Sequence, residues 1–445
     1  MARGKIKHTY RVIVMKKYGS FLELTQAFAE REGTALLYTD EDGDICSVSY
    51  RELAEMIMMR TELARQRGPG TSIIYAAPDP DTIARIFATV MGGRCVIMAS
   101  PMMPDKVLEE AQEATDRLIC RHKDPAEEGE LLFFTSGTTN RSKVVRLTPH
   151  SLLCSAWSGQ NMFECGPDDR ILCLLPLSHV FGIVCSLLWG LAYGATIALC
   201  PEVSDRLKAP MLFRPTILPA VPAIADAMVR NDALNPELKE LLIGAAPCSD
   251  WTVQALKEKG INVYIGYGLT ETSSGVAITK NMDELDAMYL CPDTEVEIEP
   301  DGEIAISTPC MMKGYLGQPE TTEGHKLLTG DLGWLDEEGR LHLQGRKKDV
   351  IILSDGSKIN CPEYEHDIAE MSGETDIALI DIDDEIILVV GAGADTDSLW
   401  EAVEEYNKTM LQSQQIADIV EFGRPLPRTL TGKIRRYELQ RRYQY

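Results

Sequence analysis

Short apolar runs alternate with amphipathic, helix-length segments along the first two-thirds of the chain. Helices are predicted over Phe21–Arg31 and Tyr50–Arg67. Short buried strands are predicted over Thr71–Ala76, Cys95–Ala99, Leu131–Thr135, Ile171–Leu174, Thr196–Leu199, Thr216–Ala220, Leu241–Gly244 and Asn262–Ile265. Because strands separated by helix-length segments typically pair in parallel, this alternation predicts an α/β body.

The pattern changes near Cys291, where two pairs of alternating segments flank turn sequences. The first turn is Pro300-Asp301-Gly302 and the second is Glu338-Gly339, and both predict antiparallel hairpins. The flanking strands are predicted over Glu295–Ile298, Glu303–Ser307, Gly333–Leu335 and Leu341–Leu343.

Beyond Gly345-Arg346-Lys347-Lys348 the pattern is that of a small α+β domain of ~100 residues. It predicts a hairpin, a helix over Glu363–Met371, strands over Asp376–Ile380 and Glu385–Val390, a helix over Ser398–Leu411, a last strand and a tail. We therefore predict an N-terminal domain of residues 1–345, a hinge at 346–348 and a C-terminal domain of residues 349–445.

Length and charge narrow the possible functions. A chain of 445 residues is too long for one compact domain, and its formal charge of −24 argues against a general nucleic-acid or anionic-membrane surface. Only the two ends are basic, residues 1–17 and 424–445. The sequence shows no secretion-signal pattern and no apolar run long enough to span a membrane. The 12 cysteines form no CxxC pair, which favours reduced, mostly buried thiols and a cytoplasmic enzyme.

The strongest local motif is Phe134-Thr135-Ser136-Gly137-Thr138-Thr139-Asn140-Arg141-Ser142-Lys143. A loop of hydroxyl and glycine residues after a strand, closed by a lysine, can direct N–H groups, hydroxyls and one ammonium toward phosphate oxygens. The loop is not a Walker A motif, because G-x-x-x-x-G-K-S/T would need glycine at Ser142 and a hydroxyl residue at Val144. Alone, it is equally compatible with a surface turn.

Four further motifs follow in order. They are Tyr267-Gly268-Leu269-Thr270-Glu271, Thr329-Gly330-Asp331 before a hairpin, Gly345-Arg346-Lys347-Lys348-Asp349, and Pro427-Arg428-Thr429-Leu430-Thr431-Gly432-Lys433. With Pro176–Gly182 and Gly244–Pro247, this series resembles the adenylate-forming superfamily of acyl-CoA synthetases, adenylation domains and luciferases, from about Phe21 to the C-terminus. Its motif style is most similar to acyl-CoA ligases.

The resemblance implies α/β subdomains and a small β-barrel-like subdomain, followed by a small mobile C-terminal domain. It implies two steps: a carboxylate attacks the α-phosphate of Mg·ATP, giving acyl-AMP and pyrophosphate, and a thiol then takes the acyl group. Two unit charges ~4 Å apart interact by about 4 kcal/mol at an effective dielectric of 20, so the two anions need a cation between them. Lys433 in the basic tail is our candidate for that mobile cation.

The resemblance also implies roles for individual residues. The catalytic residues would be Lys433, Lys143, Thr270 and Glu271, and the metal would lie at Glu271 and Thr138. ATP and AMP would be bound by Thr135, Ser136, Gly137, Thr138, Thr139, Gly244, Ala245, Ala246, Pro247, Tyr267, Gly268, Asp331 and Arg346. Lys348 would be the hinge residue, and Gly356 would line the approach of the thiol.

The acid-binding region carries no carboxylate. Amino-acid activators of the family have an aspartate near the position of His179, whereas this chain reads Ser178-His179-Val180-Phe181-Gly182-Ile183-Val184-Cys185. We therefore predict an apolar or aromatic acid, with His179, Phe181, Gly182 and Gly266 lining its pocket. Core packing is an equally good explanation for Phe181.

Several functions stay open from sequence alone. The leading prediction is an ATP- and Mg²⁺-dependent acyl-CoA ligase for an apolar or aromatic carboxylic acid, with CoA as co-substrate and a place in fatty-acid metabolism. One alternative delivers the acyl group to the phosphopantetheine of an acyl carrier protein, and another is an o-succinylbenzoate-type CoA ligase. A third is a catalytically silent acyl- or nucleotide-binding protein, against which the retained lysines and carboxylates argue.

Overall fold

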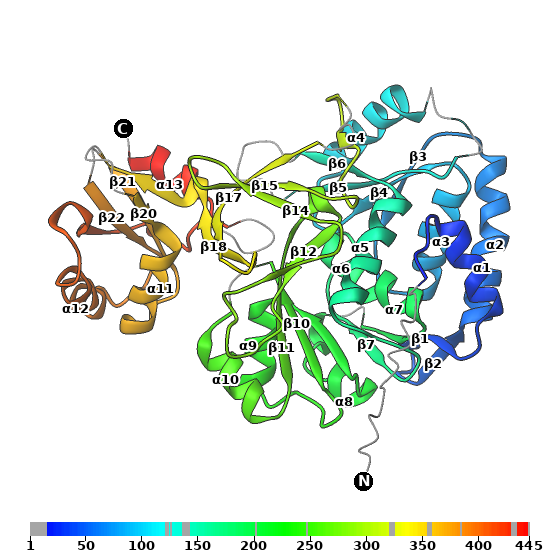
Figure 1. Ribbon diagram of the computed structural model, residues 1–445, viewed down its shortest axis with the longest axis horizontal. Helices are drawn as coiled ribbons and strands as arrows, with labels where there is room; N and C mark the ends of the chain where they lie inside the picture. The colour runs from blue at the N-terminus through cyan, green and yellow to red at the C-terminus, as the bar shows by residue number, and fades with distance from the viewer. Residues whose placement is uncertain are drawn as a thin grey trace, which may run out of the picture.

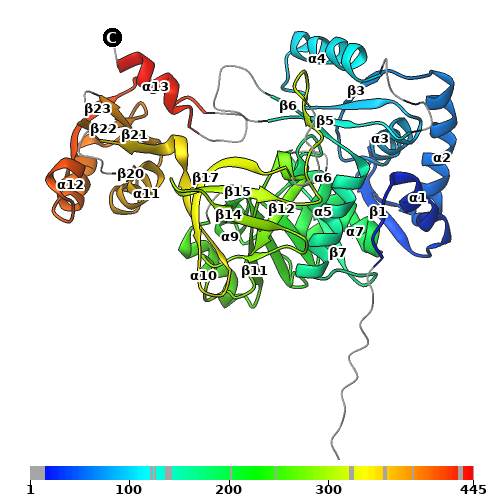
Figure 2. The same cartoon turned by 45° about the horizontal axis from the view of Figure 1, so that its top comes forward.

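The computed structural model describes residues 16–120, 124, 127–135, 143–200, 203–245, 248–319, 325–353, 358–382, 385–428 and 434–443. Eight of the predicted site residues lie outside these ranges: Ser136, Gly137, Thr138, Thr139, Ala246, Pro247, Gly356 and Lys433. Figures 1 and 2 show the described elements as α/β layers at one end, an antiparallel sheet in the middle and a smaller α+β group at the other end.

The largest sheet has nine strands in the order β13-β12-β11-β10-β9-β7-β8-β1-β2. From β1 to β11 across this order the neighbouring strands are parallel, while β2, β12 and β13 are added antiparallel. The strands are β1 Thr34–Thr39, β2 Ile45–Ser49, β7 Arg170–Cys173, β8 Thr196–Leu199, β9 Ile217–Ala220, β10 Glu240–Gly244, β11 Asn262–Leu269, β12 Ser274–Ile278 and β13 Tyr289–Leu290. The predicted parallel α/β body is therefore confirmed.

A second sheet has the order β16-β6-β5-β4-β3. Its strands are β3 Thr71–Tyr75, β4 Cys95–Ala99, β5 Leu131–Phe134, β6 Val144–Leu147 and β16 Gly314–Tyr315. One continuous core of buried apolar side chains, with members from Tyr18 to Leu327 along the chain, packs both sheets together. Burial of these side chains at roughly 25 cal/mol per Å² of apolar surface is what fixes the two sheets relative to each other.

Helices begin where the sequence provides caps. In α2 the Ser49 side chain accepts from the Glu52 backbone and the Glu52 side chain accepts from Ser49, and α3 begins with Asp79 followed by Pro80. The helices before the middle sheet are α1 Phe21–Glu30, α2 Tyr50–Gln66, α3 Pro80–Met91, α4 Asp105–Leu118, α5 Pro149–Met162, α6 Val180–Ile183, α7 Trp189–Tyr193, α8 Ala209–Phe213, α9 Pro222–Arg230 and α10 Asp250–Glu258. Short helical turns occur at η2 Val184–Leu188, η3 Val203–Asp205 and η4 Thr270–Thr272.

The middle sheet has the antiparallel order β14-β15-β17-β18. Its strands are β14 Glu295–Ile298, β15 Glu303–Ser307, β17 Leu327–Leu335 and β18 Leu341–Arg346. Both predicted hairpins are present. The expectation that Thr329-Gly330-Asp331 precedes a hairpin is wrong, because β17 starts at Leu327 and these residues lie within the first strand of that hairpin. Asp331 pairs with Arg346 on β18, and the pairing of β17 with β15 shifts register at this point.

The C-terminal elements have their own apolar core. Two clusters contain only residues between Ile351 and Tyr443, and they pack the three-stranded sheet β21-β22-β23 against its helices. The elements are η5 Lys347–Asp349, β19 Val350–Ile352, β20 Lys358–Asn360, α11 Cys361–Ser372, β21 Ile377–Ile382, β22 Glu385–Val390, α12 Thr396–Asn407, η6 Gln412–Gln414, β23 Ile416–Glu421 and α13 Arg436–Tyr443. Figure 1 shows this group beyond β18, at the far end from α1 and α2. A separate core supports the predicted domain boundary at 346–348, which stays a prediction.

The cysteines behave as predicted. All 12 are free thiols, and nine of them are buried. Within the described residues, no helix combines the length and hydropathy needed to cross a membrane.

Candidate active site

The ends of the hydroxyl-rich loop are held by a β-hairpin. β5 and β6 pair antiparallel, and the Thr135 backbone N–H donates to the Lys143 carbonyl at 2.9 Å. Lys143 is exposed and Thr135 is half-buried. The residues between them lie outside the described ranges, but the two predicted site residues at the base of the loop are adjacent.

A buried ion group crosses the same hairpin. Arg146 on β6 donates from Nε and Nη2 to the carboxylate of Glu130, directly before β5, at 2.8 and 3.0 Å. Lys313 adds a third charge, with its Nζ 3.4 Å from Glu130 Oε1. Burial alone would raise the pKa of Glu130, but the hydrogen bonds and charges of Arg146 and Lys313 outweigh it and hold the pKa below its ordinary value. Glu130 is therefore a buried carboxylate anion that ties β5, β6 and the start of β16 together.

Glu271 lies on the short turn η4, directly after β11. Its backbone carbonyl accepts from Met312 N–H at 2.8 Å, and its Oε1 accepts from the hydroxyl of Tyr315 at 2.8 Å. The ammonium of Lys143 lies over the Tyr315 ring, 4.4 Å from the centroid. Lys143 and Glu271, two predicted catalytic residues 128 positions apart in the chain, therefore both contact Tyr315. The sequence analysis did not name Tyr315, because no motif of the sequence pointed to it.

Asp331 is buried in the middle of β17, with both carboxylate oxygens in use. Oδ2 accepts from the Tyr267 hydroxyl at 2.7 Å, and Oδ1 lies 2.7 Å from Nε of Arg346. Burial first, and then the charge and hydrogen bond of Asp331, raise the pKa of Tyr267, so this hydroxyl stays protonated and donates. Three predicted nucleotide-binding residues from different motifs are thus in direct contact.

β11 is longer than predicted, and the difference concerns the site. The sequence predicted a strand over Asn262–Ile265 with the Tyr267–Glu271 motif after it, whereas β11 continues to Leu269. It does so because β12 pairs with it antiparallel, with a bulge between Tyr267 and Gly268. Tyr267 and Gly268 are therefore strand residues, and only Thr270 and Glu271 lie on the turn.

Two predicted subsites meet at the ends of β10 and β11. Gly244 pairs in register with Gly266. The ring of Phe181 lies against Gly244, since a side-chain Cβ at 244 would come within 3.0 Å of two ring atoms. Ala245 then adopts φ 75°, the left-handed region that costs a non-glycine residue of order 1–3 kcal/mol and that clusters at functional sites.

The other pocket candidates lie at the start of α6. His179 is the N-cap residue, and burial lowers the pKa of its imidazole, which is therefore neutral at pH 7. Gly182 is buried, and a Cβ there would lie 2.2 Å from the carbonyl oxygen of Pro176. Close packing of α6 on the preceding chain explains this glycine. Of the residues predicted to line the acid pocket, the uncharged His179 and Phe181 are therefore the ones whose side chains could contact a substrate.

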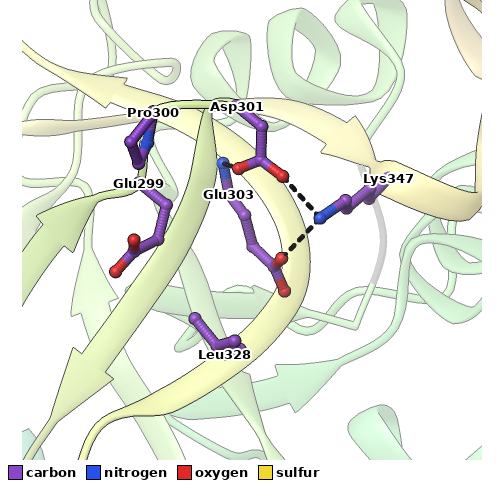
Figure 3. A pocket seen from close by; sticks show the side chains of 6 residues that line it. All are labelled: Glu299, Pro300, Asp301, Glu303, Leu328 and Lys347. Atoms are coloured by element: carbon purple, nitrogen blue, oxygen red, sulfur yellow. Dashed lines mark hydrogen bonds and ion pairs between the residues drawn. The ribbon is translucent and has the colours of Figure 1, made fainter.

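A pocket of about 370 Å³ lies beside the predicted hinge (Figure 3). Lys347 Nζ donates to Asp301 Oδ2 at 2.6 Å and to Glu303 Oε2 at 2.8 Å, and these hydrogen bonds raise the pKa of Lys347. Glu303 Oε1 accepts in turn from the Gly330 N–H at 2.8 Å, one residue from Asp331. Lys347 is therefore anchored to the middle sheet through these hydrogen bonds, although it is as exposed as its neighbour Lys348, the predicted hinge residue.

The residues present fit a nucleotide-bound Mg²⁺ better than a resident metal centre. In the described part of the chain, no group of three or more His, Cys, Asp or Glu side chains is arranged to hold a metal ion. Glu271 supplies one half-buried carboxylate. Mg²⁺ bound with nucleotides commonly takes one or two carboxylates, substrate phosphates and water.

The flanks of Lys433 are described, although Lys433 itself is not. Arg428 and Ile434 form an antiparallel bridge, and the Arg435 N–H donates to the Pro427 carbonyl at 2.8 Å. Arg428 also pairs with Asp376 at 2.8 Å. The described residues on both sides of the predicted mobile cation are thus bonded to each other and, through Arg428, to Asp376 directly before β21.

A family model described as "AMP-binding enzyme" matches residues 90–316, slightly more than half of the chain. The matched segment contains Lys143, Phe181, Gly244, Glu271 and Tyr315. The chain belongs to the AMP-binding enzyme family. The resemblance drawn from the motifs is therefore confirmed.

Among curated relatives, this AMP-binding enzyme is 29% identical over 368 residues to a long-chain-fatty-acid–CoA ligase of Bacillus subtilis, covering 74% of this chain and 64% of the relative. It is 28% identical over 332 residues to a 2-succinylbenzoate–CoA ligase of Listeria monocytogenes, covering 70% of each. The match thus spans slightly less than two-thirds of the first relative's length.

Solved structures of low identity share the fold of this AMP-binding enzyme. An o-succinylbenzoate CoA synthetase of Bacillus subtilis, in complex with its acyl-adenylate intermediate, aligns with a TM-score of 0.79 at 22% identity, covering 94% of this chain and 97% of that one. An anthranilate CoA ligase in complex with anthranoyl-AMP also gives 0.79, at 17% identity, covering 96% and 98%. The predicted fold class is confirmed over nearly the whole length.

Proposed function

We propose that the protein is an AMP-forming acyl-CoA ligase that acts on an apolar or aromatic carboxylic acid. A carboxylate oxygen of the acid attacks the α-phosphorus of ATP, the bond from that phosphorus to the bridging oxygen breaks, and pyrophosphate leaves. The sulfur of CoA then attacks the acyl carbon, and AMP leaves. The observation that carries the proposal is the meeting of Lys143 and Glu271 on Tyr315, inside the segment that matches the family.

The two charged groups have separate tasks in this proposal. Lys143, at the end of the hydroxyl-rich loop, neutralises the β- and γ-phosphates. Glu271 holds Mg²⁺, which supplies charge neutralisation at the phosphate oxygens when bound. Thr270, beside Glu271, contacts the α-phosphate.

Asp331 accepts hydrogen bonds from the ribose hydroxyls. Its two oxygens are fixed by Tyr267 and Arg346, so the carboxylate is already oriented. The segment Gly244–Pro247 and the Tyr267 region bind the adenine. Arg346 is the last residue of β18, and its Nη1 also donates to the Thr329 carbonyl at 3.4 Å.

The acid pocket lies around Phe181 and the neutral His179 in this proposal. No carboxylate occurs between Ser178 and Cys185 to pair with a substrate ammonium. An uncharged wall favours an apolar or aryl acid over an amino acid. The names of the relatives, a long-chain fatty acid ligase and a 2-succinylbenzoate ligase, fit both ends of that range.

A pyrophosphate-release assay tests the proposal directly. Short-, medium- and long-chain fatty acids, aryl acids, o-succinylbenzoate and the 20 amino acids would be offered with Mg·ATP, with and without CoA. We expect release with one of the acid classes and acyl-CoA formation when CoA is present. Release with amino acids only would contradict the predicted pocket, and transfer only to a carrier-protein phosphopantetheine would replace CoA as the acceptor.

The hinge at Lys348 has a kinetic test. Proline at 348 fixes φ near −65° and removes an N–H, so rotation about this residue would be impaired. We expect Lys348→Pro to lower the rate of thioester formation several times more than the rate of acyl-AMP formation, measured separately. Lys348→Ala is the matched control, because it removes the same charge but keeps the rotation. Equal losses in both half-reactions would argue against a hinge.

A further inference from the structure

Tyr315 contacts two oppositely charged groups with different parts of its side chain. Its hydroxyl donates to Glu271 Oε1 at 2.8 Å, and its ring face carries the Lys143 ammonium at 4.4 Å from the centroid. Tyr315 is half-buried and lies on β16, a two-residue strand. Neither contact follows from the other, since one needs the phenol oxygen and the other needs the ring.

The backbone around Tyr315 is fixed to the elements that carry both partners. Gly314 and Tyr315 pair with Arg146 and Val145 on β6, and the Leu316 N–H donates to the Val144 carbonyl at 2.8 Å. Lys143 directly precedes β6. On the other side, Met312 N–H donates to the Glu271 carbonyl at 2.8 Å. The short strand therefore connects the end of the hydroxyl-rich loop to the turn that carries Glu271.

The direction of the hydrogen bond between Tyr315 and Glu271 follows from the two groups. An ionised carboxylate only accepts, so the phenol hydroxyl donates and Glu271 Oε1 accepts. Because Oε1 of Glu271 receives this hydrogen bond, Oε2 is the oxygen left to face a cation.

We propose that Tyr315 is a positioning residue for nucleotide binding: its hydroxyl orients the Glu271 carboxylate toward Mg²⁺, and its ring holds Lys143 ready for the phosphates. The inference rests on the proposed function and adds a residue to that site. A carboxylate and an ammonium this close to a common side chain would attract each other, and a direct ion pair would neutralise both before substrate arrives. Tyr315 gives each of them a separate partner.

The ring contact is also easy to release. A cation on an aromatic face is held more weakly than a cation that makes charge-assisted hydrogen bonds to phosphate. Lys143 therefore leaves the ring when the triphosphate binds, whereas the hydrogen bond from the hydroxyl to Glu271 persists. The two halves of the tyrosine side chain act on different ligands, the hydroxyl on the metal and the ring on the nucleotide.

Binding of Mn²⁺, a paramagnetic substitute for Mg²⁺, tests this division. Electron paramagnetic resonance would measure Mn²⁺ affinity in the presence of a non-hydrolysable ATP analogue, and fluorescence titration in EDTA would measure the analogue alone. Tyr315→Phe should weaken Mn²⁺ binding about tenfold, the lower end of the effect of losing a hydrogen bond to a metal-ligating group, and leave metal-free analogue binding unchanged. Tyr315→Leu should weaken both.

The control is Tyr289→Phe. Tyr289 on β13 also carries a lysine on its ring, Lys280 at 5.4 Å from the centroid, and it belongs to no predicted subsite. A double variant separates positioning from general damage: with Glu271→Gln already present, Tyr315→Phe should weaken Mn²⁺ binding no further.

The outcomes distinguish a failure of the positioning role of Tyr315 from a failure of the proposed acyl-CoA ligase function. Unchanged Mn²⁺ affinity in Tyr315→Phe, with normal wild-type binding, would overturn the positioning role alone. An additional loss in the Glu271→Gln background would also overturn it, because the effect would not pass through Glu271. A wild-type protein that binds no Mn²⁺ with the analogue would overturn the proposed function as well.

Discussion

Replacing Lys433 with alanine is expected to lower the rate of acyl-AMP formation by about 10²-fold or more. Removing one preorganised charge-stabilising donor typically has this effect, because the transition state loses a cation between two anions. Pyrophosphate release under single-turnover conditions measures the loss. Thioester formation from chemically prepared acyl-AMP should be affected much less, since that step needs no cation between carboxylate and phosphate.

The fold should tolerate this change. The segment on either side of Lys433 is held by the Arg428–Asp376 pair, by the bridge from Arg428 to Ile434 and by the hydrogen bond of Arg436 Nη1 to the Leu379 carbonyl at 3.0 Å. Arg441→Ala is the matched control, because it removes one exposed positive charge from the neighbouring helix α13. An adenylation rate equal to that of wild type in Lys433→Ala would remove this lysine from the mechanism.

Replacing Arg146 with methionine should lower the free energy of unfolding by about 3–5 kcal/mol, the range measured when one partner of a buried ion pair is removed. The side chains of Arg146 and Glu130 are only 9% and 4% exposed, so the abandoned Glu130 carboxylate would remain largely out of water. Lys313 would still pair with the Glu130 carboxylate, so we expect a loss of unfolding free energy near the lower end of this range. Urea unfolding followed by circular dichroism gives the value.

A control variant and a double variant are compared with Arg146→Met by the same urea unfolding measurement. Lys326→Met removes the exposed pair with Glu297, where both side chains are at least half exposed, and should lower the free energy of unfolding much less than Arg146→Met does, because water screens the pair. The double variant Glu130→Gln with Arg146→Met should recover part of the loss, because it leaves no buried charge unpaired, and Lys313 is exposed to water. A loss in Arg146→Met no larger than that in Lys326→Met would contradict the buried ion group.

This ion group also predicts a pH dependence. The pKa of Glu130 is lower in the folded protein than its ordinary value of 4.5, so the stabilisation is complete above that value and is lost as the pH falls through the folded pKa. The stability difference between wild type and Glu130→Gln should therefore be constant near neutral pH and shrink in acid. A difference that grew on acidification would have the wrong sign for a lowered carboxylate pKa.

Local pattern was sufficient for elements whose ends are set by nearby residues. β4, β8, β14, β15 and β22 have the predicted bounds, because apolar or alternating residues stop at turn residues. The extension of β11 and the early start of β17 were not predicted. Both depend on ladder pairing with neighbouring strands, β12 in one case and β15 and β18 in the other, which no local property of the strand itself reveals.

The sequence motifs predicted the individual residues of the site, but they did not predict which of these residues contact one another. Sequence analysis named Lys143, Glu271, Asp331 and Arg346 singly, and their roles stay predictions. The contacts of Tyr267 with Asp331 and of Tyr315 with Glu271 join residues 64 and 44 positions apart, and they arise from strand pairing that fixes distant segments side by side. Tyr315 lies in the segment Lys313-Gly314-Tyr315-Leu316-Gly317, outside every motif that the sequence analysis named, so it was not predicted.

The anchored side chain of Lys347 separates a moving part from a stationary one. Asp301 and Glu303 hold Lys347 to the middle sheet, and the predicted hinge residue Lys348 follows directly after it. If the C-terminal domain turns about Lys348, its twist is absorbed after the anchor and does not travel back along β18 to Arg346. The carboxylate that faces the sugar would then stay still while the other domain exchanges one half-reaction for the next, so the adenylate need not be released between them.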